Sequence, residues 1–141
     1  MNIRGLFETR RLEVFLASST TLFGAWLLMP WDAMATSSFD MILAAASENV
    51  WGLVFLLNGL GHMFALAING RRWWTPFARW IASLISGMVY LAFCIGFILQ
   101  SWETTAVPVY FSMACGFVIC LYFAWRDARL ALEVRRHVAN A

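Results

Sequence analysis

The chain has no lysine and few charged residues of any kind. Arginine, aspartate and glutamate together make up 13% of its 141 residues, whereas 62% are hydrophobic and the mean hydropathy is +0.70. A soluble domain usually has roughly a quarter of its residues charged. The composition therefore excludes an ordinary soluble domain and indicates a single integral membrane domain.

Cysteine is also scarce, and its positions argue against a disulfide framework. Cys94, Cys115 and Cys120 fall within apolar runs, out of reach of an aqueous oxidant, so we interpret them as small packing residues. The sequence shows no pair of nucleophile and base, no cluster of metal ligands and no glycine-rich phosphate loop. These absences disfavour an enzyme, a metal site and a cofactor.

Four apolar stretches are long enough to cross a bilayer. In residues 50–68 there are 19 residues without a charge, about 28 Å of helix against a hydrocarbon core of roughly 30 Å. Tryptophan, glycine or proline marks the ends of the stretches. The sequence predicts an all-α fold, an integral membrane four-helix bundle with spans at about residues 14–31, 50–68, 77–100 and 108–125.

Arginine is confined to one side of the predicted membrane. All ten arginines lie near the N-terminus, around the connection between the second and third spans, or after the fourth span. Because arginine favours the cytoplasmic side, both termini are predicted to be cytoplasmic. Arg79 opposes the dipole of its helix, and we interpret it as reaching toward inner headgroups. The predicted inner-interface anchors are Arg10, Arg11, Arg71, Arg72, Trp73, Trp74, Arg79, Arg126 and Arg129.

Short amphipathic helices at the membrane surface are predicted for residues 1–13, for the first outer segment at 32–47 and for the tail at 126–141. Clustered arginines attract anionic lipid headgroups or nucleic acid, and the carboxylates among them favour lipid. Residues 1–35 also resemble a signal peptide that ends in Ala33-Met34-Ala35. The 18-residue apolar run exceeds the usual signal length, so an uncleaved first span is preferred.

Polar and small residues recur at matching depths when residues are counted from the inner ends of the spans. Such residues let helices approach closely and hydrogen-bond to one another, so both sets are expected to face the bundle axis. Cys94 and Cys115 are expected at similar height between the third and fourth spans. The intramembrane polar set is Thr20, Thr21, Asn58, His62 and Ser83, and the small-residue set is Gly24, Gly59, Gly87, Cys115 and Gly116.

His62 and the threonines have structural and functional interpretations. The threonine hydroxyls can bond to carbonyls one turn back. His62 is expected to be neutral and hydrogen-bonded to Thr20 or Ser83, and the alternative is a role in proton or ligand binding. Haem ligation is disfavoured because His137, the only other histidine, lies in the tail.

Two stretches, ALAINGRRWWTPFARWIASLISGMVYL and FAWRDARLALEV, resemble small four-span membrane proteins encoded by tailed bacteriophages. The resemblance implies insertion in the bacterial host's inner membrane. It also implies work in lysis, superinfection exclusion or DNA entry. Such a protein acts without catalysis, as a homo-oligomer or through another membrane protein.

Three functions follow, in order of preference. The first is this non-enzymatic accessory role, for example a holin-like one. The second is a small proton-coupled transporter or channel similar to the small multidrug resistance proteins. That family uses a buried glutamate in its first span, whereas the span predicted at residues 14–31 has no carboxylate. The third is a membrane redox subunit.

Overall fold

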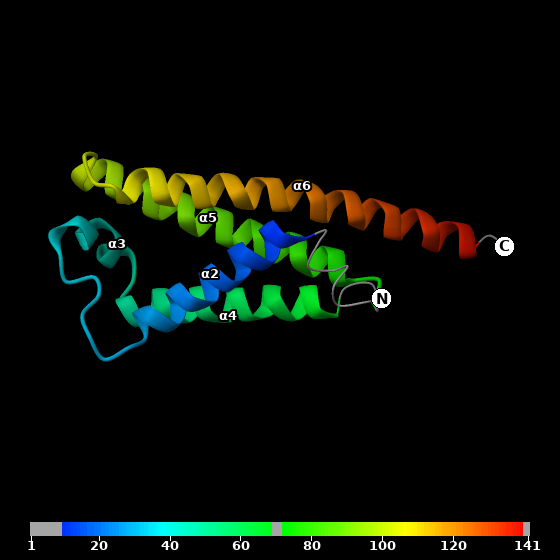
Figure 1. Ribbon diagram of the computed structural model, residues 1–141, viewed down its shortest axis with the longest axis horizontal. Helices are drawn as coiled ribbons and strands as arrows, with labels where there is room; N and C mark the ends of the chain where they lie inside the picture. The colour runs from blue at the N-terminus through cyan, green and yellow to red at the C-terminus, as the bar shows by residue number, and fades with distance from the viewer. Residues whose placement is uncertain (1–9, 69–71, 140–141) are drawn as a thin grey trace.

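The computed structural model describes residues 10–68 and 72–139, and this part of the chain contains helices and no β-strand, which confirms the all-α prediction (Figure 1). Short loops connect the helices. The long helices are α2 (Arg11–Leu27), α4 (Glu48–Ala67), α5 (Thr75–Ser101) and α6 (Ala106–Ala139), and between α2 and α4 lie the 3-10 turn η1 (Ser37–Phe39) and α3 (Asp40–Ala45).

The four long helices form two pairs. α2 packs mainly on α4 and α5 mainly on α6, and the contact between α4 and α5 joins the pairs. We call the end of the bundle that carries the α4–α5 connection the Arg-rich end. The opposite end, where η1 and α3 lie, is called the Arg-free end (Figure 1).

Three of the helices are long and apolar enough to cross a membrane. They are α4, α5 as far as Gln100, and α6 as far as His137. α2 has 17 residues, about 26 Å, at the short limit for a span. The helix that carries the first predicted span lies about a turn closer to the N-terminus than that span, because α2 begins at Arg11 and ends at Leu27. Pro30 lacks an N–H and disfavours helix at the residue before it, which explains the early end.

The tail continues α6 instead of forming a separate helix. α6 has 34 residues without interruption, about 51 Å, and its C-terminal part extends past the other helices (Figure 1). The predicted break at residue 126 is therefore wrong, since the tail contains strong helix formers and neither glycine nor proline. Of the predicted N-terminal surface helix, residues 11–13 belong to α2, Arg10 caps its start, and residues 1–9 lie outside the described residues.

The predicted short helix of the first outer segment is present as α3, at the Arg-free end. Ile42 of α3 is buried, and its carbonyl accepts a hydrogen bond from Trp51 Nε1 at 3.1 Å. The Glu48 carboxylate, at the start of α4, accepts bonds from the N–H groups of Ala33 at 3.0 Å and Met34 at 3.3 Å. Glu48 thus orders the loop before α3.

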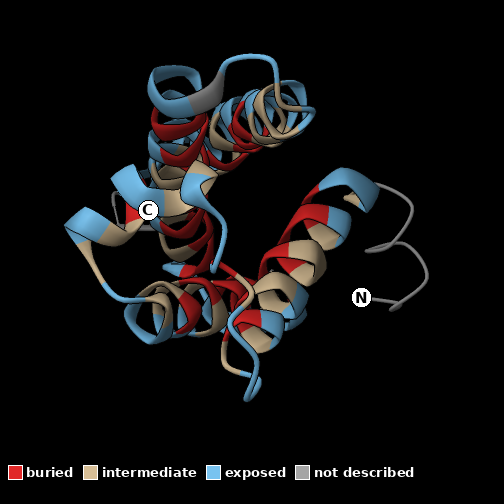
Figure 2. Ribbon diagram, turned by 90° about the vertical axis from the view of Figure 1, so that its left-hand side faces the viewer, coloured by how far each residue is buried: buried red, intermediate tan, exposed pale blue. Residues whose placement is uncertain are grey.

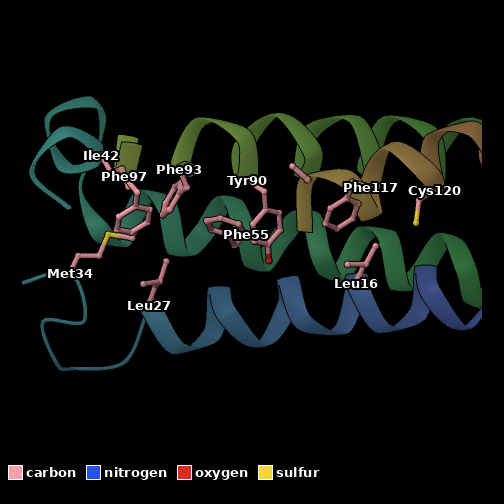
Figure 3. Close-up of a cluster of buried hydrophobic side chains, with 11 residues drawn as sticks. Leu16, Leu27, Met34, Ile42, Phe55, Tyr90, Phe93, Phe97, Phe117 and Cys120 are labelled. Atoms are coloured by element: carbon pink, nitrogen blue, oxygen red, sulfur yellow. The ribbon is translucent and has the colours of Figure 1, made fainter. Parts of the chain in front are cut away.

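The bundle interior is rich in aromatic rings. Phe55, Tyr90, Phe93, Phe97 and Phe117 point into the space between the helices (Figure 3). The rings of Phe55 and Phe93 are 5.3 Å apart, and those of Tyr90 and Phe117 are 5.6 Å apart. The buried faces of the helices point inward and the exposed faces point away (Figure 2). The exposed faces carry many large apolar side chains, as expected of helices that contact lipid.

Two glycines set the close approach of α2 and α4. A Cβ atom at Gly24 would stand 2.8 Å from the carbonyl oxygen of Gly52, and one at Gly59 would stand 2.9 Å from the Cα atom of Thr21. Backbone atoms cannot move aside as a flexible side chain can. Any larger residue at Gly24 or Gly59 would therefore push α2 away from α4.

Candidate functional site: an ion cluster at the Arg-rich end

Arg79 lies in the first turns of α5, and its side chain is fully buried. Its Nε donates to Oε2 of Glu13 at 2.8 Å, and its Nη2 donates to Oε1 of the same carboxylate. This is the two-bond geometry in which arginine holds a carboxylate most firmly. The interpretation of Arg79 as a side chain that reaches toward headgroups is wrong, because Glu13 provides an internal partner.

Asp127 of α6 extends this ion pair into a cluster. Its Oδ2 accepts a hydrogen bond from Arg79 Nη1 at 3.0 Å and another from Arg10 Nη2 at 2.7 Å. Arg10 Nη1 also lies 3.8 Å from Glu13 Oε1. Two carboxylates and two guanidinium groups therefore tie the start of α2 to α5 and α6. We call Arg10, Glu13, Arg79 and Asp127 the ion cluster.

His62 of α4 is fully buried beside the ion cluster. Its Nε2 lies 3.8 Å from Glu13 Oε2, too far for a hydrogen bond, and neither ring nitrogen has a hydrogen-bond partner in the described part of the chain. Its ring also lies 6.3 Å from that of Phe117. A buried polar group without a partner costs about 1 to 3 kcal/mol. His62 is therefore a departure from ordinary packing that needs an explanation.

Neither predicted partner of His62 forms a hydrogen bond with it among the described residues. Thr20 donates to the carbonyl of Leu16 at 2.8 Å, and its hydroxyl lies 3.4 Å from that of Tyr90. Ser83 Oγ is buried and has no partner among the described residues. The prediction that His62 hydrogen-bonds to Thr20 or Ser83 is thus wrong. The α2 threonines instead donate to backbone carbonyls of their own helix.

The remaining polar residues serve helix packing. Thr21 donates to the carbonyl of Ala17 at 2.9 Å, one turn back, as predicted. Asn58 donates to the carbonyl of Ala82 at 3.0 Å and to Ser86 Oγ at 2.6 Å. Asn58 therefore joins α4 to α5, one turn of α4 away from His62.

The small-residue set divides between the interior and the outer surface. Gly24 and Gly59 lie between α2 and α4, Gly116 lies against Leu16, and Gly87 lies near Phe117. Cys115 is exposed.

The prediction that Cys115 faces the axis and the shared interface with Cys94 is wrong. Cys94 is buried, and its thiol donates to the carbonyl of Val107 at 3.6 Å. On α6, the buried residues Phe117, Cys120 and Ala124 are spaced by three and four, so they share the face that points to the interior. Position 115 falls off that face.

The other predicted anchors lie at the Arg-rich end, mostly on its surface. Arg11, Arg72, Trp73 and Trp74 are exposed, whereas Arg71 lies outside the described residues. The guanidinium of Arg129 lies 4.8 Å from the ring centre of Trp125, which stabilises both groups. These side chains have the composition of a membrane–water interface.

A pocket of about 320 Å³ opens beside the ion cluster, between the first turn of α2 and α6. Arg126, which packs over the ring of Phe123 at 5.3 Å, stands in its lining. The lining mixes charged and apolar groups: Arg10, Leu12, Glu13, Cys120, Phe123, Arg126 and Asp127.

Sequence reasoning missed Glu13 and Asp127 as members of the site, although a signal was present. On α2, Glu13 shares the stripe of Thr20 and Gly24 at spacings of three and four residues, and that stripe is buried. On α6, Asp127 adjoins the buried stripe through Ala124 and Ala128. A carboxylate on the buried stripe of a helix requires a cation, and Arg79 is the cation at that depth.

Comparison of the chain with protein families, curated proteins and solved structures finds no match. The proposed function therefore rests on the geometry of the ion cluster and His62. Within residues 10–68 and 72–139, no three His, Cys, Asp or Glu side chains are grouped closely enough to hold a metal ion.

Proposed function

We propose that the protein crosses the bacterial inner membrane four times, with both termini and the Arg-rich end in the cytoplasm. Arginine gathers at the Arg-rich end, as the positive-inside rule requires of a cytoplasmic face, and exposed tryptophans lie toward both ends of the bundle, as expected at the two membrane surfaces. The exposed face of α2 carries Leu22, which is 70% exposed, and Trp26, which is 56% exposed, and both suit contact with lipid. α2 can therefore act as a short fourth span.

Reporter fusions test this topology. A fusion at Ala141 is expected to report the cytoplasm and a fusion at Ala106 the opposite side. The contrast requires an odd number of membrane crossings between the two positions, which the single helix α6 provides. The same compartment for both fusions would overturn the topology.

Within that topology, we propose that the protein is a small proton-coupled transporter or channel. The observation that carries the proposal is the buried, unpaired His62 next to a carboxylate that Arg79 already holds. Ionisable groups inside membrane proteins are rare and commonly mark ion or proton pathways. Histidine is the side chain that most readily changes charge near neutral pH.

A purely stabilising role explains this arrangement less well. Buried ion pairs often add little to stability, because removing two charges from water offsets their attraction. His62 adds to this cost in stability, because its buried polar ring has no hydrogen bond among the described residues. A leucine of similar volume would pack without that loss. The site therefore lowers the stability of the fold, and proton binding provides a functional reason for its presence.

A carboxylate in the first helix supports the transporter proposal. The first helix begins three residues earlier than the predicted span, so it includes Glu13, which is 3% exposed. A buried glutamate in the first span is the feature that small multidrug resistance proteins use. Glu13 lies near the helix end rather than its middle, which places the proposed proton site close to the cytoplasm.

The geometry suggests how a proton would act. Protonated His62 would be a cation 3.8 Å from Glu13 Oε2, on the carboxylate that Arg79 holds. The attraction of two unit charges at that distance is about 4 kcal/mol at an effective dielectric constant near 20. A hydrogen bond between charged groups is worth about 1.5 to 3 kcal/mol. Arg79 lies closer to Glu13 and makes two such bonds to it, so protonated His62 would not displace Arg79 by attraction alone. It would be a third cation beside two carboxylates, and its repulsion of Arg79 would loosen α2 from α5.

Proton flux in proteoliposomes tests this function. A potassium diffusion potential would drive protons inward, and an internal dye would report acidification. The wild type is expected to acidify the lumen faster than protein-free liposomes, and His62→Gln is expected to reduce the added flux at least about tenfold, because glutamine cannot take up a proton.

His137→Gln is the matched control, because His137 is exposed in the tail of α6 and distant from the cluster. It should retain the flux of the wild type. Equal flux in wild-type and protein-free liposomes would overturn the proposal, as would full flux in a folded His62→Gln variant.

A second candidate is the non-enzymatic accessory role, in which the protein associates with a copy of itself or another membrane protein. An apolar groove of about 260 Å³ on the surface of α5 and α6 favours it, since Gly87, Ala114 and Cys115 leave room there for a neighbouring helix. This role predicts no proton flux. It also predicts dimers cross-linked through Cys115 in native membranes.

A further inference from the structure

The pocket between α2 and α6 contains an arginine that the ion cluster does not use. Arg126 is exposed, packs over Phe123, and forms no ion pair with any described residue. Its neighbour Arg10 binds Asp127 through Nη2 and also lines the pocket. Two guanidinium groups therefore border one pocket.

We propose that this pocket binds the phosphate of an anionic phospholipid headgroup. The charge balance supports an anion: Glu13 and Asp127 are matched by Arg79 and Arg10, so Arg126 adds one unmatched positive charge. Guanidinium groups bind phosphate oxygens through paired hydrogen bonds. Basic pockets between membrane helices on the cytoplasmic side are suited to anionic headgroups.

The apolar part of the lining favours a lipid over a free phosphate ion. Leu12 and Phe123 are about 40% exposed, and they border the pocket together with the Cys120 thiol. The exposed Leu12 and Phe123 side chains can contact the glycerol and the first acyl carbons, which inorganic phosphate lacks. A volume of about 320 Å³ accommodates a headgroup phosphate with part of its glycerol, while the acyl chains remain in the membrane.

The inference rests on the proposed placement of the Arg-rich end at the cytoplasmic headgroups and does not depend on proton binding by His62. A lipid bound here would contact the first turn of α2 and α6 at once. It would therefore hold together the two helices that Asp127 and Arg10 already join.

Native mass spectrometry of the full-length protein in neutral detergent provides the test. Phosphatidylglycerol, phosphatidylcholine and inorganic phosphate are added separately, and retained adducts are counted. The wild type is expected to retain one phosphatidylglycerol in preference to phosphatidylcholine. Arg126→Gln is expected to weaken that binding about tenfold, the effect of losing one hydrogen bond to a charged group.

Arg129→Gln is the matched control, because Arg129 lies one turn further along α6, packs over Trp125 and does not line the pocket. It should bind phosphatidylglycerol like the wild type. Equal loss in the two variants would overturn the site in favour of diffuse surface charge. Equal retention of phosphatidylcholine would overturn the anionic class, and phosphate bound as well as phosphatidylglycerol would overturn the lipid.

Discussion

Arg79→Gln is expected to lower the free energy of unfolding by about 3 to 5 kcal/mol, the effect of removing one partner from a buried ion pair. Glutamine cannot neutralise the two carboxylates that Arg79 contacts. Among the described residues, Asp127 keeps Arg10 at 2.7 Å, whereas Glu13 keeps Arg10 and His62, each at 3.8 Å. The measurement is denaturant-induced or thermal unfolding in a mild detergent.

Two companion variants separate this effect from a general effect of losing an arginine. Arg72→Gln removes an exposed arginine near the start of the same helix and should change the stability by less than about 0.5 kcal/mol. The double variant Glu13→Gln/Arg79→Gln should be more stable than Arg79→Gln, because it removes the unmatched charge. Equal stability of Arg79→Gln and Arg72→Gln would mean that the ion cluster does not hold the bundle together.

The helical architecture could be predicted because it depends on local properties. Apolar runs, Pro30, Pro76 and Pro108 mark elements within a few residues along the chain. The errors arose where the sequence gives no stop signal. Nothing interrupts helix formation at residues 13 or 126, so α2 and α6 extend through charged segments that had been assigned to the membrane surface.

The candidate site was harder to predict because it depends on pairing between distant helices. Asn58 and His62 were recognised as buried polar residues from their place within a span. The carboxylates were not, since each stands near a span end where water would suffice as a partner. Only the packing of α2, α5 and α6 shows that Glu13 and Asp127 both meet Arg79. The prediction of the orientation of Cys115 failed for a related reason. The depth of a residue along a helix does not determine which side of the helix faces the bundle.

Reagent access to Cys120 is expected to rise when His62 takes up a proton. Cys120 is fully buried and lines the pocket beside Glu13. If protonated His62 repels Arg79, the first turn of α2 loosens and exposes the thiol.

The most direct measurement of this coupling is the rate at which a charged methanethiosulfonate modifies Cys120 in a chain carrying Cys94→Ala and Cys115→Ala. The same chain with His62→Gln is measured at each pH, so that the intrinsic reactivity of the thiol cancels in the ratio of the two rates. The ratio is expected to rise at least about tenfold from pH 8 to pH 5, which corresponds to a shift of about 1.4 kcal/mol between the closed and loosened states. A ratio that stays constant across this range would contradict proton-driven loosening of α2 by His62.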